Sequence, residues 1–507
     1  MTAGTPTLTE AAAAADASDI VPGPPSGAEV TGRSFAAARW VALASVGNVV
    51  LSFGVFLVLA RLIAPAEFGM VAIAAVFIDI LQIVARCGLP DAVVQRADLD
   101  EDFAATAFWV MLGTGILCAV ALAASAGPIA WIFDLPELRP VLGALSLCFV
   151  ITAAGAIHEA RLQRSFGFRK LALRALGANL VGGAVALAMA YAGYGVWSLV
   201  VQRLVAATAT TLLTWAASRW VPARRLDLAA ARTQIAFGSR VFCTYLLLVL
   251  SIRSQEVIAA YFLSAADIGY LRLAWRCIDL VSQVAVIPLT TVGLTTYARL
   301  QDRPEELAAA FQTFTVASCF VAVPAFFGMA AVAPTLIPFL FGDQWHEAAP
   351  VLRILALLAP EFVATSMLWM IFTALGRNGT ALRLAGAQFG LGAVAAVVTA
   401  PLGLVALVAG HVARAYLFTP VIVSAAGRIV PVGNRRLVRT LLPVTACSGA
   451  MAALVLLIQD PLLAALGDRI GLFAAVGVGM LAYAALAQVF MADTVRSALG
   501  FFLRRTA

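Results

Sequence analysis

A stripe of polar side chains runs through residues 268–296, a stretch that is otherwise largely apolar. The stripe consists of Arg272, Arg276, Asp279 and Gln283. Successive members are four, three and four residues apart, so all of them lie on one face of a helix. An arginine guanidinium is planar and donates paired hydrogen bonds that fit phosphate or carboxylate oxygens. The chemistry that this stripe predicts is the binding of an anion.

Charged side chains also interrupt the other long apolar stretches. Their arginines are Arg86, Arg203, Arg240, Arg253, Arg272, Arg276 and Arg414, and their acids are Asp79, Glu256, Asp279 and Glu361. An ionisable group at the centre of a bilayer costs about 2.5–3.5 kcal/mol, so such a group faces a cavity or a partner. Because the arginines outnumber the acids, we expect a cationic cavity that attracts an anion.

The structural alternative is that these charges form salt bridges inside the helix bundle. The local pairs would be Asp79 with Arg86, and Arg276 with Asp279. Arg272 and Arg86 lie near expected helix ends, where a long side chain also reaches the membrane interface. These explanations account for single residues but leave the cationic surplus of the whole set unexplained.

Signatures of enzymatic catalysis are absent from the sequence. The three histidines are His158, His346 and His411, far apart in the chain, and no H-E-x-x-H, P-loop or G-x-S-x-G motif occurs. The seven cysteines lack metal-ligand spacing. We therefore expect neither an enzyme nor a cofactor. Any coupling would use an ion gradient or consumption of the product, and the candidate carboxylates are Asp79, Glu256 and Asp279.

The elements that position these residues are long apolar helices. The 507-residue chain is 62% hydrophobic and only 12% charged, and about 20 apolar residues in a helix cross a bilayer. We predict an all-α polytopic membrane protein with about fourteen transmembrane helices. They are expected at 40–60, 69–89, 106–126, 140–159, 173–192, 195–217, 236–262, 268–296, 308–333, 351–375, 382–400, 403–425, 440–458 and 470–491.

Lysine and arginine in the short connections predict the orientation of these helices. With both termini in the cytoplasm, nearly all basic loop residues fall on the inner side. The formal charge of +7 then reflects topology and gives no reason to expect nucleic acid. Residues 1–32 are expected to be a disordered cytoplasmic tail, and residues 218–235 a basic cytoplasmic linker.

Two segments of the chain are nearly repeated. Residues 67–80 read EFGMVAIAAVFIDI, and residues 267–280 read DIGYLRLAWRCIDL. The copies lie in the second and the eighth expected helices, an even offset of six, so both enter the membrane in the same direction. This is a parallel repeat, which predicts two six-helix lobes around a central cavity with alternating access. The lobes would span residues 33–217 and 236–425, and residues 426–507 would add two transmembrane helices and a cytoplasmic tail.

Three segments resemble the polysaccharide-transporter branch of the multidrug/oligosaccharidyl-lipid/polysaccharide exporter superfamily. They read RLIAPAEFGMVAIAAVFIDILQIVARCGLPDAVVQR (61–96), ADIGYLRLAWRCIDL (266–280) and LIPFLFGDQWHEAAPVLRILAL (336–357). The resemblance implies an inner-membrane flippase of undecaprenyl-pyrophosphate-linked saccharides, of the Wzx type, working beside polymerases and other polysaccharide-assembly proteins. Relatives often carry an acid near the middle of the seventh helix, where this chain has Arg253-Ser254-Gln255-Glu256. The coupling is therefore left open.

The diphosphate of such a lipid-linked oligosaccharide would supply the expected anion. We expect the first, second, seventh and eighth helices to line the cavity, with Arg253, Arg272 and Arg276 binding the diphosphate. Arg240, Arg86 and Gln283 complete the expected wall. The alternatives are a multidrug or cation antiporter, a flippase for the peptidoglycan precursor, and a membrane-embedded polymerase or ligase. An antiporter for cations favours an acidic cavity, and a polymerase favours a large external loop.

Overall fold

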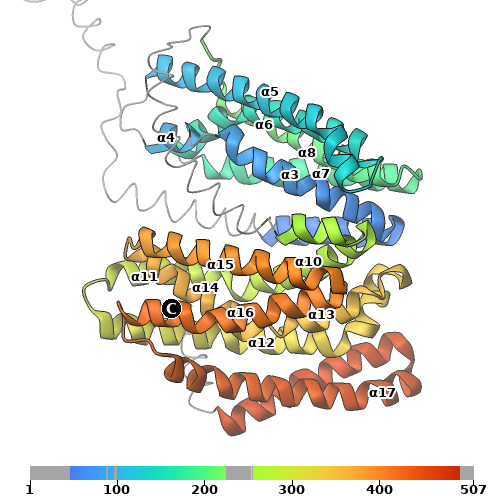
Figure 1. The fold of residues 1–507 in the computed structure, drawn as a ribbon, viewed down its shortest axis with the longest axis vertical. Helices are drawn as coiled ribbons and strands as arrows, with labels where there is room; N and C mark the ends of the chain where they lie inside the picture. Colours follow the sequence, from blue (N-terminus) through green and yellow to red (C-terminus); the bar gives the residue numbers. More distant parts are fainter. Residues whose placement is uncertain are drawn as a thin grey trace, which may run out of the picture.

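The computed structural model describes residues 46–86, 89–95, 100–165, 167–223, 253 and 255–491. Every regular element in these ranges is a helix. The helices form two bundles that lie one above the other in Figure 1, with α3 of the first bundle against α10 of the second. The expected tail at 1–32, most of the linker at 218–235 and Arg240 lie outside the described residues.

The N-terminal bundle contains an unlabelled first helix and six labelled ones. They are Val46–Leu62, α3 (Pro65–Arg86), α4 (Leu89–Gln95), α5 (Glu101–Ile132), α6 (Leu138–Arg164), α7 (Phe168–Tyr191) and α8 (Val196–Ser218). The pairs α5/α6 and α7/α8 pack along their lengths. Their connections are short turns, as expected for antiparallel neighbours.

The C-terminal bundle follows helical residues 255–262. Its helices are α10 (Ala265–Ala285), α11 (Ile287–Arg299), α12 (Pro304–Phe341), α13 (Ala348–Ala356), α14 (Ala359–Ala374), α15 (Asn378–Thr399), α16 (Leu404–Gly427) and α17 (Asn434–Phe490). Short 3-10 turns occupy Asp343–Trp345 and Ala400–Leu402. Helix α17 packs along α12 on the outside of this bundle, at the lower edge of Figure 1.

Two expected spans are broken helices. The span at 268–296 is α10 and α11, bent by 49°, and the span at 351–375 is α13 and α14, bent by 55°. Pro288 and Pro360 lie in the first turn of α11 and α14. Proline fits that position because its missing N–H needs no intrahelical partner, whereas inside a straight helix it would remove a hydrogen bond.

The described helices account for all but one of the expected spans. Nine helices of the described ranges are long and apolar enough to cross a membrane, or up to eleven if each bent pair is one span. Helix α17 contains both expected C-terminal spans, separated at Gly467 with its positive φ of 75°. Together with Val46–Leu62, these helices account for every expected span except 236–262, which lies largely outside the described residues.

The repeated acid caps a helix in both copies. Ser264 and Asp267 form a capping box at the start of α10, in which each side chain accepts from the other residue's backbone N–H. In the first copy, Glu67 accepts from the backbone N–H of Ala64 at 3.1 Å. Its second oxygen accepts from the N–H of Val196 at the start of α8, at 3.0 Å. The shared acid therefore starts α3 and α10 in the same way.

The repeated glycine allows the two lobes to touch. A Cβ added at Gly69 would lie 1.6 Å from the carbonyl oxygen of Ala265, and one added at Gly269 would lie 2.1 Å from the carbonyl oxygen of Pro65. Positions 65 and 265 correspond in the repeat. The contact is therefore reciprocal, as at a two-fold axis, and the two copies face each other across it.

Candidate functional site

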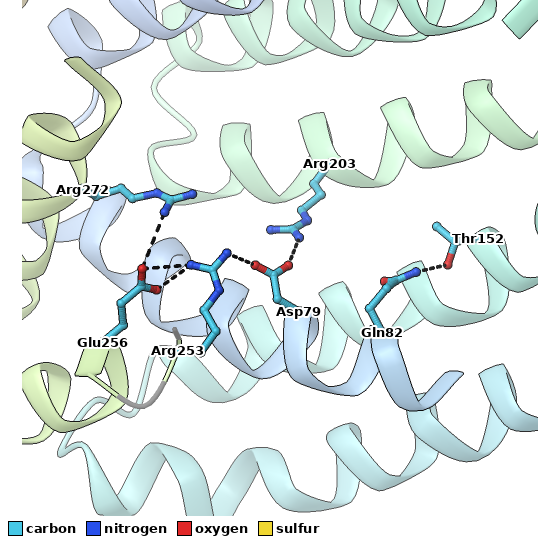
Figure 2. Close-up of polar contacts among 7 residues, drawn as sticks. All are labelled: Asp79, Gln82, Thr152, Arg203, Arg253, Glu256 and Arg272. Atoms are coloured by element: carbon cyan, nitrogen blue, oxygen red, sulfur yellow. Dashed lines mark hydrogen bonds and ion pairs between the residues drawn. The ribbon is translucent and has the colours of Figure 1, made fainter. Parts of the chain in front are cut away.

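An ion network joins the two lobes near the middle of α3 (Figure 2). The Arg253 guanidinium donates to Asp79 Oδ2 at 2.7 Å and to Glu256 Oε2 at 2.8 Å. Arg203 in α8 donates to the other oxygen of Asp79 at 3.2 Å. Arg272 in α10 lies 4.0 Å from Glu256 Oε1. Two carboxylates thus face three guanidinium groups, which leaves a cationic surplus in the network.

The local salt bridges considered from the sequence are wrong for this structure. Asp79 pairs with Arg203 and Arg253 from other segments, and no ion pair in the described part of the chain joins it to Arg86. Seven residues along a helix correspond to about 10 Å of rise, too far for a direct pair between these side chains on one helix. Arg276 and Asp279 form no ion pair within 4.0 Å either, and Arg86 is exposed near the end of α3.

The stripe on α10 divides between two environments. Arg276 donates to Ser52 Oγ at 2.7 Å, and its guanidinium lies 5.8 Å from the ring centre of Phe56. Both partners belong to the Val46–Leu62 helix. Arg272 instead has 47% of its side chain exposed and borders a cavity together with Asp279. Arginines on one helix face therefore reach both the lobe junction and the cavity.

The cavity has a volume of about 730 Å³. Its wall is formed by the segment at 253–256 and by α10, α13, α14, α15 and α16. Arg253, Glu256, Arg272 and Asp279 are the predicted site residues that line it. The described cavity residues of the seventh expected helix are Arg253, Gln255 and Glu256, and those of the eighth belong to α10. Neither Arg276 nor Gln283 is among its described lining residues.

Helix α3 borders only a small side space of the site. Ala72, Ile73 and Val76 line a space of about 20 Å³ that shares Glu256 and Arg272 with the main cavity. The sequence placed the first two helices in the wall of one central cavity. In the described structure these helices instead form the lobe junction next to it, because α3 turns Asp79 toward Arg253 and its small apolar residues toward α10.

Other cavity residues were not assigned to the site from the sequence. They are Gln255, Trp275, Trp369, Gln388, His411 and Arg414. Arg414 was counted as an intramembrane cation. It lies far from α10 in the sequence, so the sequence did not predict that it shares a cavity with Arg272. The available signal was polar or indole-bearing side chains in the otherwise apolar helices α14, α15 and α16. Within the described ranges, no group of three His, Cys, Asp or Glu side chains is placed to hold a metal ion.

The long apolar helices of the two lobes define the class of this molecule as a multi-pass α-helical membrane protein. Residues 58–350 match the family described as polysaccharide biosynthesis protein, which is more than half of the chain. The chain belongs to this family.

Two characterised relatives have informative names. The chain is 28% identical over 318 residues to the succinoglycan biosynthesis transport protein ExoT of Rhizobium meliloti (strain 1021), covering 63% of this chain and 64% of that protein. It is 25% identical over 335 residues to the lipopolysaccharide biosynthesis protein WzxC of Escherichia coli (strain K12), covering 64% and 67%. The chain therefore matches slightly less than two thirds of the length of ExoT.

Solved structures share the fold at low sequence identity. The lipid II flippase MurJ in an inward closed conformation superposes with a TM-score of 0.71 and 11% identity, over 91% of this chain and all of MurJ. An inward-facing multidrug transporter of the MATE family gives a TM-score of 0.59 and 16% identity, over 75% of this chain and 95% of that one. These comparisons show that the chain shares its overall fold with these two proteins.

Proposed function

We propose that the protein is a flippase for undecaprenyl-pyrophosphate-linked saccharide units. It would move them from the inner to the outer leaflet of the bacterial inner membrane, with both chain termini in the cytoplasm. Membership of the polysaccharide biosynthesis family and the transport function named for ExoT support this proposal. A polymerase and other polysaccharide-assembly proteins would use the product.

The observation that carries the proposal is a charged cavity inside a membrane-embedded bundle. A diphosphate in hydrocarbon loses its hydration, at a cost that rules out unassisted crossing. Arg253 and Arg272 line the cavity, and Arg276 lies one helical turn from Arg272. The hydrogen-bond donors of these side chains would replace the water molecules that the diphosphate loses. The lipid tail would remain in the surrounding bilayer.

The ion network suggests how binding acts on the lobes. Arg253 is engaged by Asp79 of the N-terminal lobe and by Glu256 of its own segment. An incoming diphosphate would compete with these carboxylates for the guanidinium. The ion pair between Arg253 and Asp79 joins the two lobes. If the diphosphate replaced Asp79 as the partner of Arg253, the contact between the lobes would weaken, which would favour alternating access. Asp79, Glu256 and Asp279 remain the candidate coupling carboxylates.

The charge of the site argues against an antiporter for organic cations. A cation entering the cavity would meet Arg253 and Arg272, and the ion network retains more guanidinium groups than carboxylates. The positive charge of such a ligand would be repelled by these arginines, and this repulsion is strong in a low dielectric.

Replacement of Arg272 and Arg276 by alanine tests the proposal. In cells whose own copy of the gene is deleted, each single variant is expected to reduce surface polysaccharide roughly tenfold at matched membrane levels. A charge-assisted hydrogen bond contributes about 1.5–3 kcal/mol, and 1.4 kcal/mol is a factor of ten. Lipid-linked intermediate should accumulate in the inner leaflet.

The matched control is Arg139→Ala, which removes an exposed arginine from the first turn of α6. It should export polysaccharide like the wild type. Normal export by a variant that lacks both Arg272 and Arg276 would contradict the proposed site.

A further inference from the structure

Arg414 in α16 is a buried cation with unsatisfied hydrogen-bond donors in the described structure. It is 6% exposed, and its Nε and Nη1 atoms have no hydrogen-bond acceptor there. The nearby acid is Glu361 in α14, but no ion pair within 4.0 Å joins the two side chains. Glu361 instead accepts from Thr419 Oγ1 at 3.1 Å. Arginine remains charged in proteins, so this site favours an anion.

Arg414 lines the 730 Å³ cavity on the wall formed by α15 and α16. Beside it, His411 Nδ1 lies 2.9 Å from Gln255 Oε1. The Gln255 amide fits against Gly392, where an added Cβ would lie 2.2 Å from its Nε2 atom. This glycine therefore makes room for the amide. The polar groups of this wall are held in place by their neighbours rather than by solvent.

Aromatic rings form much of the remaining cavity lining. They belong to Trp275, Phe362, Trp369 and Phe389. Trp275 also contacts the His411 ring edge-on, with ring centres 5.7 Å apart. Pyranose rings present C–H faces that pack on aromatic side chains, while their hydroxyl groups hydrogen-bond to amides and imidazoles. An apolar lining with a few fixed polar groups is typical of a small-molecule subsite.

We infer that this wall is a subsite for an acidic sugar, in which Arg414 binds the carboxylate of a uronic acid. The sugar ring packs against Trp275 and Trp369, and Gln388 and His411 hydrogen-bond its hydroxyl groups. The inference rests on the proposed function and extends it. In this arrangement Arg253, Arg272 and Arg276 bind the diphosphate, and Arg414 binds the carboxylate of the saccharide.

Two disaccharides that differ in one carboxylate test the inference. Cellobiouronic acid and cellobiose are titrated into the purified full-length protein in lipid nanodiscs, with binding followed by saturation-transfer NMR. The wild type is expected to bind the acid roughly tenfold more tightly, and Arg414→Gln to lose this preference. Equal binding of both sugars by the wild type, or a preference that survives in Arg414→Gln, would overturn the inference.

A second variant keeps the test informative if Arg414→Gln folds poorly. Glu361→Gln removes the nearby negative charge and leaves an oxygen to accept from Thr419. It should bind cellobiouronic acid several-fold more tightly than the wild type, because the field at Arg414 becomes more positive. Unchanged or weaker binding of the acid would count against an anion at Arg414.

Inorganic pyrophosphate separates this inference from the proposed function. Arg276→Ala should weaken pyrophosphate binding and retain the preference for the acidic disaccharide. If the wild type does not bind pyrophosphate but binds the acidic disaccharide more tightly than cellobiose, the proposed diphosphate site is wrong and the sugar subsite is supported. If Arg276→Ala abolishes the acid preference, the carboxylate binds at the diphosphate arginines, and the assignment to Arg414 is wrong.

Discussion

Arg253 has two roles that its position in the sequence conceals. Its guanidinium lies between Asp79 and Glu256, with 22% of the side chain exposed, and it lines the cavity. A fully paired arginine would attract an anion weakly. Here Arg203 shares Asp79, and Arg272 approaches Glu256. The two carboxylates are thus shared among three arginines, and Arg253 both joins the lobes and lines the cavity in which we propose that the diphosphate binds.

A double-mutant cycle measures the lobe-joining bond. Asp79→Asn and Arg253→Gln should each lower the free energy of unfolding in detergent by about 2 kcal/mol, since each leaves a half-buried charge with fewer partners. The coupling between the two changes should be about 1–2 kcal/mol. Measurement is by thermal unfolding, with Arg139→Ala as a surface control. Additive effects would show that the bond does not stabilise the lobe junction.

At the scale of elements, the reciprocal contact between α3 and α10 explains the repeated sequence. The acid of each copy caps its own helix, and the glycine of each copy admits a carbonyl oxygen from the other helix. Both features lie at the starts of these helices, an end that the orientation predicted from the basic loops would put on the outer side of the membrane. The lobes of this structure are therefore in contact at that end.

Alanine at Gly69 or Gly269 should prevent this contact. The added Cβ would overlap the carbonyl of Ala265 or Pro65, so the lobes would have to separate. We expect surface polysaccharide to fall roughly tenfold or more with either variant at matched protein levels, because a forced shift of packed backbones costs more than 1.4 kcal/mol.

Gly113→Ala in α5 is the matched control for these glycine variants. A Cβ at that position has no atom within 4 Å, so the change adds the same methyl group to a transmembrane helix without a clash. Export should be normal. Normal export by Gly69→Ala as well would mean that the close approach is dispensable.

For the whole molecule, the first helix belongs to both lobes. The Trp345 indole donates to the carbonyl oxygen of Ala60 at 2.6 Å, and Arg61 Nε donates to that of Leu340 at 2.8 Å. Ile63 and Phe68 share a buried cluster with Trp345. These contacts lie at the same end as the glycine crossing. Opening of this end would have to break them together, which makes the end a candidate gate.

Trp345→Phe should weaken the gate while keeping most of the ring packing. The loss of one hydrogen bond to a buried carbonyl should cost about 1 kcal/mol and increase the population of the open state. The readout is the labelling rate of a cysteine introduced at Ile63, which is 1% exposed, with a membrane-impermeant maleimide in a cysteine-free background. A labelling rate equal to that of the parent protein would exclude a gating role for Trp345.

The cationic stripe on α10 shows which features of the site helical periodicity predicts and which it does not. Spacing placed Arg272, Arg276 and Asp279 on one face, and Arg272 and Asp279 do share the cavity. It did not reveal that Arg276 turns toward Ser52. Periodicity fixes which residues share a helix face, but the neighbour that this face meets depends on how the helices pack. Hydropathy continues through the bends at 286–288 and 357–359, so each bent pair of helices was expected as one span.

Composition and pattern alone determined that this chain is a polytopic helical membrane protein, since only helices of that length and apolarity satisfy the backbone within a bilayer. The near-repeat also predicted parallel lobes, because the second and eighth expected helices, which carry the two copies, run in the same direction. Only the tertiary structure decided that Arg253 ties the lobes and that Arg414 shares a cavity with Arg272. The physical reason is that charge pairing depends on distances of a few ångströms between helices far apart in sequence, and packing alone sets those distances.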